Sequence, residues 1–117
     1  PLLKAEILKT MQEWGQEILT GAYQIDNVWA QAFSVLSYCR MLQSLATGTV
    51  QSKTRGAAWA KKALDPKWGP LIADALAGRV NQYTRYYLPA DPDNVQLTQA
   101  FIRYALEEAP KLAGVAE

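Results

Sequence analysis

Residues 37–60, SYCRMLQSLATGTVQSKTRGAAWA, decide the fold because they join two predicted helices through a glycine. Gly48 is the expected left-handed end of the first helix, and Ser52 is suited to cap the second. The same stretch places Arg40 inside the first helix and Lys53 just after the glycine stop. Two cations in these positions can face a single ligand that carries phosphate.

The N-terminal half is expected to be helical because its apolar residues recur at steps of three and four. A first helix runs over about residues 3–20 and ends at Gly21. The second helix begins after Asp26, which is suited to cap it, and runs to Gly48. We expect this second helix to be central to the core. A shorter third helix follows and is weakened by Gly56.

The C-terminal half is expected to add two helices. Asp65, followed by Pro66 at the first helical position, starts a helix that ends at Gly78 or continues into the residues after it. The aromatic-rich residues that follow give mixed signals, and their structure stays open. Asp93 or Asn94 then caps the last helix.

The last helix is expected to bend or end at Pro110. No segment of the chain shows period-two alternation of β-branched residues, and no segment is repeated. Residues 1–117 therefore predict a single domain with an all-α fold, a five-helix bundle. The buried face of its last helix is expected to consist of Leu97, Phe101, Tyr104, Ala105 and Ala109.

The composition excludes several classes of protein. A chain of 117 residues with 50% apolar and 20% charged residues can form one ordinary hydrophobic core. Its net charge of +1 gives no general electrostatic reason to expect a nucleic-acid or membrane-surface partner. No apolar run approaches the roughly 20 residues that span a bilayer. We therefore expect a soluble intracellular protein.

The chain contains no His and a single Cys, Cys39. It therefore lacks the usual zinc ligands and any Ser-His or Cys-His nucleophile pair, which excludes most hydrolases. Cys39 cannot form an internal disulfide, and it lies in the apolar stripe of a predicted helix. Both observations favour a reducing, cytoplasmic setting.

The spacing of four residues carries a family resemblance: eight positions separate Arg40 from Gly48, five separate Gly48 from Lys53, and six separate Lys53 from Trp59. This pattern resembles the C-terminal helical domain of the aminoglycoside adenylyltransferases that modify streptomycin and spectinomycin. The resemblance continues without a gap into residues 64–78, LDPKWGPLIADALAG. It implies the accessory C-terminal domain of a two-domain nucleotidyltransferase. Such an enzyme transfers AMP from ATP to a hydroxyl of an aminoglycoside or related acceptor.

In that family the metal-binding and catalytic carboxylates lie on an N-terminal nucleotidyltransferase domain. This chain begins at Pro1 and lacks the Gly-Ser followed by an Asp-x-Asp pair that holds magnesium and triphosphate in that domain. We therefore expect a truncated form or a fragment, with the N-terminal domain and a small-molecule acceptor as its partners. ATP and magnesium are expected in the parent protein, and neither is expected to be bound by this chain alone.

Arg40 and Lys53 each have two interpretations. The residues alone favour an ion pair or a carbonyl contact for Arg40, since charges near a core are usually paired. Lys53 opposes the dipole of its helix unless an anion is nearby, but it also belongs to a basic run that is typical of a solvated face. The resemblance implies instead that both side chains reach the triphosphate of ATP.

Arg79 and Asp26 are less well matched. Arg79 stands where well-known family members have a tyrosine that touches the nucleotide, so it is either a phosphate contact or a surface residue. Asp26 is the plausible match to an acidic residue that contacts the acceptor, and it is equally a natural helix cap.

The remaining aromatic residues leave a second function open. Trp59 and Trp68 are expected in the core, whereas three tyrosines, Tyr83, Tyr86 and Tyr87, can line a pocket, pack in a core or mark an interface. A non-catalytic helical protein-interaction domain, with these tyrosines on the partner surface, is therefore the alternative to an adenylyltransferase domain.

Overall fold

The computed structural model describes residues 2–80 and 89–114, with side chains over 3–77 and 89–114. In this part of the chain the expected all-α fold is confirmed, and the single exception to helix and loop is an isolated antiparallel bridge between Asn27 and Pro89. The elements are α1 (Leu2–Thr20), α2 (Val28–Thr47), α3 (Lys53–Ala63), the short 3-10 helix η1 (Pro66–Trp68), α4 (Gly69–Val80) and α6 (Pro92–Ala113).

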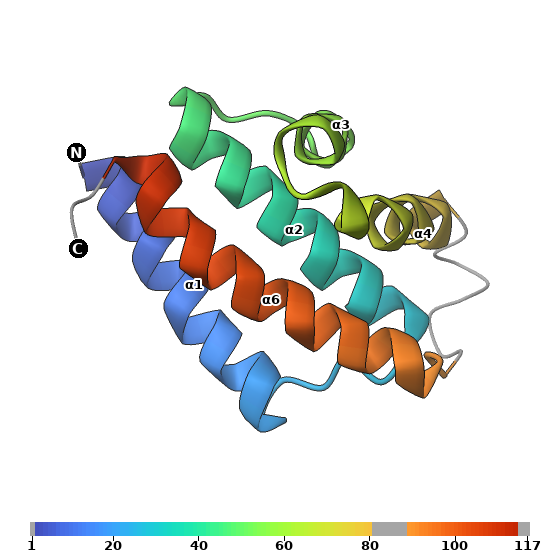
Figure 1. Cartoon of the computed structure of the whole chain (residues 1–117). Coiled ribbons are helices and arrows are strands. Elements are labelled where there is room, and N and C mark those ends of the chain that lie inside the picture. The colour runs from blue at the N-terminus through green and yellow to red at the C-terminus, as the bar shows by residue number, and fades with distance from the viewer. Residues whose placement is uncertain (1, 81–88, 115–117) are drawn as a thin grey trace.

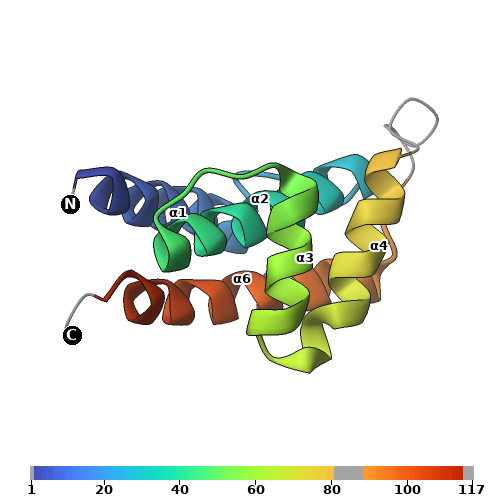
Figure 2. The same ribbon diagram turned by 90° about the horizontal axis from the view of Figure 1, so that it is seen from above.

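The helices form two groups that cross one another. Figure 1 shows α1, α2 and α6 side by side, while α3 and α4 are seen nearly end-on. In Figure 2 the same α3 and α4 run across the direction of the other three. Helix α2 packs against α1, α3, α4 and α6, which confirms that it is central to the bundle.

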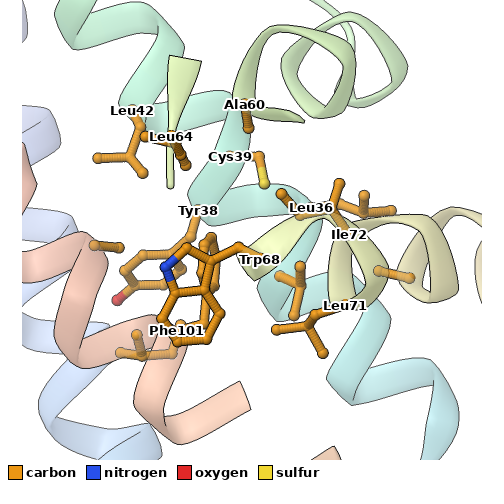
Figure 3. Close-up of a cluster of buried hydrophobic side chains, with 14 of the residues drawn as sticks. Leu36, Tyr38, Cys39, Leu42, Ala60, Leu64, Trp68, Leu71, Ile72 and Phe101 are labelled. Carbon is orange, nitrogen blue, oxygen red and sulfur yellow. The ribbon is translucent and has the colours of Figure 1, made fainter. Parts of the chain in front are cut away.

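The core lies around α2 (Figure 3). Tyr38, Cys39 and Leu42 of α2 are fully buried, and Trp68 and Phe101 pack into the same cluster from η1 and α6. The Tyr38 hydroxyl donates a hydrogen bond of 2.6 Å to the backbone oxygen of Met11, so the buried polar group is satisfied. Trp59 packs against this core while staying partly exposed.

The loop between α2 and α3 is formed as residues 37–60 predict. Gly48 has φ +75°, and its N–H donates to the Ser44 carbonyl at 2.9 Å, which ends α2. The Ser52 hydroxyl accepts from the Arg55 N–H at 3.1 Å and caps α3. A glycine stop followed by a serine cap therefore turns the chain back across α2.

Gly56 does not merely weaken α3, because it lies directly against the backbone of α2. A Cβ at position 56 would lie 2.8 Å from the Arg40 Cα and 3.1 Å from the Arg40 nitrogen. Backbone atoms cannot turn away as the end of a flexible side chain can. The glycine therefore permits α3 to approach α2 more closely than any other residue would.

The start of α6 differs from the prediction, whereas α4 extends past Gly78, which the sequence left open. Asp91 caps α6, accepting from the Asp93 N–H at 2.9 Å, with Pro92 at the first helical position, so the caps predicted at Asp93 and Asn94 are wrong. Helix α4 continues through Gly78 to Val80. A glycine inside a helix lowers the stability of that helix by only about 1 kcal/mol relative to alanine, so a helix can continue through it.

The buried face of α6 also differs from the prediction at its second turn. Leu97 is 41% exposed, whereas Thr98 is fully buried. The Gln31 side chain of α2 donates to the Thr98 hydroxyl at 3.0 Å, and this contact turns Thr98 rather than Leu97 toward the bundle. Phe101, Ala105 and Ala109 are buried as predicted.

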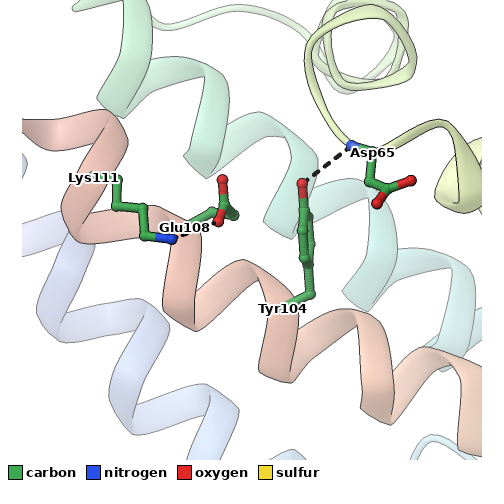
Figure 4. A network of polar contacts seen from close by, with 4 residues as sticks. All are labelled: Asp65, Tyr104, Glu108 and Lys111. Carbon is green, nitrogen blue, oxygen red and sulfur yellow. Dashed lines mark hydrogen bonds and ion pairs between the residues drawn. The ribbon is translucent and has the colours of Figure 1, made fainter.

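Helix α6 does not end at Pro110 but one turn later, at the left-handed Gly114. Polar contacts hold this helix to its neighbours. Lys4 of α1 donates to the carbonyl of Ala113 at 3.2 Å. Figure 4 shows the Tyr104 hydroxyl accepting from the Asp65 N–H at 3.1 Å. It also shows an ion pair within α6, between Lys111 and Glu108.

Gly56→Ala is expected to destabilise the fold by about 1–3 kcal/mol, although alanine is the better helix former. The added methyl group forces α3 away from α2. The matched control is Gly69→Ala, since a Cβ at position 69 meets nothing within 4 Å. Urea unfolding followed by circular dichroism measures both, and a Gly56→Ala variant as stable as wild type would contradict the packing argument.

The buried thiol predicts an alkaline loss of stability. Burial raises the pKa of Cys39 to about 12, whereas the pKa of an unfolded thiol is about 8.5. The unfolded state therefore gains the thiolate first, and stability falls as pH rises from about 9 toward 12. Between pH 8 and pH 10.5 the wild type is expected to lose about 2 kcal/mol more than Cys39→Ala in urea unfolding. Equal losses in the two proteins would show that Cys39 titrates normally.

Candidate functional site

The face of α2 that meets α3 carries three side chains of intermediate exposure. Phe33, Ser37 and Arg40 follow one another at spacings of four and three, so they lie along one side of the helix. Arg40 is at the crossing with Gly56 of α3, and Lys53 is one turn before Gly56. The two predicted cations therefore belong to the same helix crossing.

Arg40 is partly buried, as its place near the core stripe predicts. Within the described residues its side chain forms neither a hydrogen bond nor an ion pair, and the expected acidic partner is not found there. A partly buried guanidinium gains most from a charge-assisted hydrogen bond, and its planar fork suits phosphate. The position is therefore chemically suited to an anionic ligand.

The sequence on both sides of Arg40 is rich in basic residues. Residues 27–64, which include α2, the following loop and α3, contain no Asp or Glu and five basic residues. A stretch with this composition carries a net charge of +5 of its own. The basic residues are Arg40, Lys53, Arg55, Lys61 and Lys62.

Lys53 is the first residue of α3, in a turn that contains no acidic residue. Its ammonium nitrogen lies 3.8 Å from the centroid of the Phe33 ring. The face of an aromatic ring attracts a cation by about 0.5–2 kcal/mol, which offsets the unfavourable helix dipole of about 0.3–1 kcal/mol. The attraction to Phe33 thus explains why Lys53 is tolerated at the start of α3, where the helix dipole disfavours a cation.

An aromatic cluster surrounds this contact, and it was not predicted from the sequence. Phe33 stacks on Trp29, with centroids 5.1 Å apart and planes at 8°, and it meets Trp14 of α1 at 5.8 Å. Trp14 also contacts Tyr23 edge-on at 5.6 Å. The spacing of four between Trp29 and Phe33 is a signal in the sequence, but the pairing with Lys53 is not.

Asp26 does not cap α2, so that interpretation is wrong. The cap is Asn27, whose side-chain oxygen accepts from the Ala30 N–H at 2.7 Å. The backbone carbonyl of Asp26 instead accepts from the Ala90 N–H at 2.8 Å, and this bond helps fix where the helix begins. The Asp26 residue is exposed, which leaves its carboxylate accessible to a cationic ligand.

Arg79 lies in the last turn of α4, but its side chain is outside the described residues. Tyr83, Tyr86 and Tyr87 also lie outside the described residues. Helix α4 packs against both α2 and α3, so position 79 is on a helix that borders the crossing.

The described residues contain no group of three acidic, His or Cys side chains that could hold a metal ion. Among the described helices, none combines the length and the apolar composition that a membrane span requires. A hollow in the surface of α6 is lined by Leu106, Glu107, Pro110 and Lys111, none of which is a predicted site residue.

Comparison with known families agrees with the resemblance carried by residues 37–60. A family model described as "Aminoglycoside adenylyltransferase, C-terminal domain" matches residues 3–108. The matched range includes Asp26, Arg40, Lys53 and Arg79. Neither the comparison with curated proteins nor the comparison with solved structures gave a match.

The two candidate caps can be separated by substitution. Asn27→Ala is expected to lower the free energy of unfolding by about 1 kcal/mol, because the Ala30 N–H loses its partner. Asp26→Ala is expected to change it by less than about 0.5 kcal/mol, as for other surface sites. Thermal and urea unfolding of the two variants measure the difference, and a larger loss from Asp26→Ala would restore the capping role.

Proposed function

The chain belongs to the family of aminoglycoside adenylyltransferase C-terminal domains, and we propose that it closes the nucleotide site of an enzyme that adds AMP to an aminoglycoside or related acceptor. Magnesium and the catalytic carboxylates are assigned to an N-terminal nucleotidyltransferase domain. Because ATP is the co-substrate, the proposal places the reaction in the cytoplasm. An acceptor such as streptomycin or spectinomycin would make the protein an antibiotic-resistance enzyme.

Arg40 and Lys53 are proposed to bind the triphosphate. One observation carries this proposal: two cations share the α2–α3 crossing, and Arg40 has no ion-pair partner among the described residues. Arg40 suits two phosphate oxygens at once, and Lys53 supplies a compact charge with three donors. Arg79, from the neighbouring α4, is proposed as a further phosphate contact.

The reaction explains why cations are needed. The acceptor hydroxyl loses its proton to a base of the N-terminal domain, its oxygen bonds to the α-phosphorus, and the bond to the bridging oxygen of pyrophosphate breaks. Negative charge shifts onto the leaving pyrophosphate during this exchange. Fixed cations at that place stabilise the transition state more than the ground state, which is the condition for a faster reaction.

Asp26 is proposed to contact the acceptor. Its side chain is free of the capping role, and a carboxylate suits the ammonium or guanidinium groups of an aminoglycoside. The fit of magnesium to this chain is poor, because the described residues offer no cluster of carboxylates. The chain's contribution to catalysis is therefore binding and charge stabilisation.

The proposal can be tested by measuring AMP transfer in the intact enzyme that carries this chain. Arg40→Ala and Lys53→Ala are each expected to lower kcat/KM for AMP transfer by about 10²-fold, as for loss of one transition-state donor. Mass spectrometry of streptomycin, spectinomycin and other aminoglycosides, incubated with ATP and magnesium, detects the added AMP. The matched controls are Arg103→Ala and Lys9→Ala, which remove exposed cations of α6 and α1.

Wild-type transfer by a folded Arg40→Ala variant would contradict the assigned role. Transfer to none of the acceptors by a folded wild-type enzyme would favour a domain that binds a protein partner.

Asp26→Asn is expected to raise KM for the acceptor and leave KM for ATP unchanged, which separates the acceptor part of the site from the nucleotide part.

A further inference from the structure

Phe33 is held so that one face of its ring can receive the Lys53 side chain. Trp29, one turn earlier on α2, stacks nearly parallel to Phe33, and Trp14 of α1 contacts it at an interplanar angle of 57°. Phe33 and Lys53 are both of intermediate exposure. The ammonium nitrogen lies 3.8 Å from the ring centroid, well within the range of a cation–π contact.

The ring differs from a carboxylate in what it does to the ammonium group. A carboxylate would neutralise the charge and compete with phosphate for the same donors. An aromatic face attracts the ammonium through its quadrupole and leaves the net positive charge in place. The Phe33 ring thus restrains Lys53 without removing its positive charge.

We propose that Phe33 is a positioning residue for Lys53, and that its ring holds the ammonium group ready for the phosphate of the nucleotide. The inference rests on the proposed function of Lys53. Restraining a flexible side chain before the ligand arrives reduces the entropy lost on binding. Loss of the ring is therefore expected to weaken nucleotide binding without removing the charge.

The contact itself can be tested in the 117-residue chain without catalysis. A cation above a ring places the Lys53 ε-methylene protons in the shielding region of that ring. We expect an upfield NMR shift that Phe33→Leu abolishes and Phe33→Tyr keeps. Lys67, which lies 5.0 Å from the ring of Trp68, is the internal reference and should not change. An unchanged Lys53 shift in Phe33→Leu would overturn the inference.

The intact enzyme tests the consequence through a double-mutant cycle. Phe33→Leu is expected to raise KM for ATP about fivefold, with Phe33→Tyr within about twofold of wild type. In a Lys53→Ala background, Phe33→Leu is expected to raise KM by less than about twofold, because the ring has no ammonium to hold. A purely structural defect would lower the active fraction, and hence kcat, by a similar factor in both backgrounds.

Pentafluorophenylalanine at position 33 keeps the ring's shape while reversing its quadrupole, so it tests the attraction even where Phe33→Leu does not fold. It is expected to raise KM for ATP as Phe33→Leu does. A wild-type KM with this residue, or equal effects in the two backgrounds, overturns the positioning role alone. A wild-type KM for ATP in Lys53→Ala overturns the phosphate role of Lys53, and the positioning role with it.

Discussion

The close approach of α2 and α3 at Gly56 is the constraint on which the proposed site depends. The position has no room for a Cβ, since Arg40 backbone atoms would lie 2.8 Å and 3.1 Å away. Lys53 is one turn from Gly56 on the same helix, so any displacement of α3 moves its ammonium relative to Phe33 and Arg40. Gly56, which has no ligand-binding role in this proposal, thus sets the distance between Arg40 and Lys53, the two residues proposed to bind the nucleotide.

The same constraint explains how α3 is stable. Its sequence KTRGAAWAKKA is strongly polar, and its buried residues are the small ones, Gly56, Ala57 and Ala60. Small residues bury little apolar area, but they let two helix backbones come close, so that many weak contacts form along the crossing. The helix-propensity cost of Gly56, about 1 kcal/mol, is offset by that packing. The glycine that weakens α3 alone strengthens it within the bundle.

Sequence signals predicted the helices well where a local rule decides the outcome, as at Gly48 and Ser52. They failed where two adjacent residues satisfy the same rule. Asn27 rather than Asp26 caps α2, and the pairing of this segment with residues 89–90 is a long-range contact that no local pattern contains. The Phe33–Lys53 contact was missed for the same reason, since its partners lie on different helices. Arg40 and Lys53 entered as candidates through a family spacing, not through periodicity.

The distribution of charge gives the crossing its chemical character. The whole chain has a net charge of +1, but residues 27–64 carry +5 and the rest carries −4. Some acids outside the crossing serve local structure: Asp65 and Asp91 accept from backbone N–H groups, and Glu108 pairs with Lys111. A fold stabilised only by its own ion pairs would place some of those carboxylates beside Arg40. The stretch that forms the crossing therefore carries a positive charge of its own, and such a charge is favourable once an anion from outside the chain is bound there.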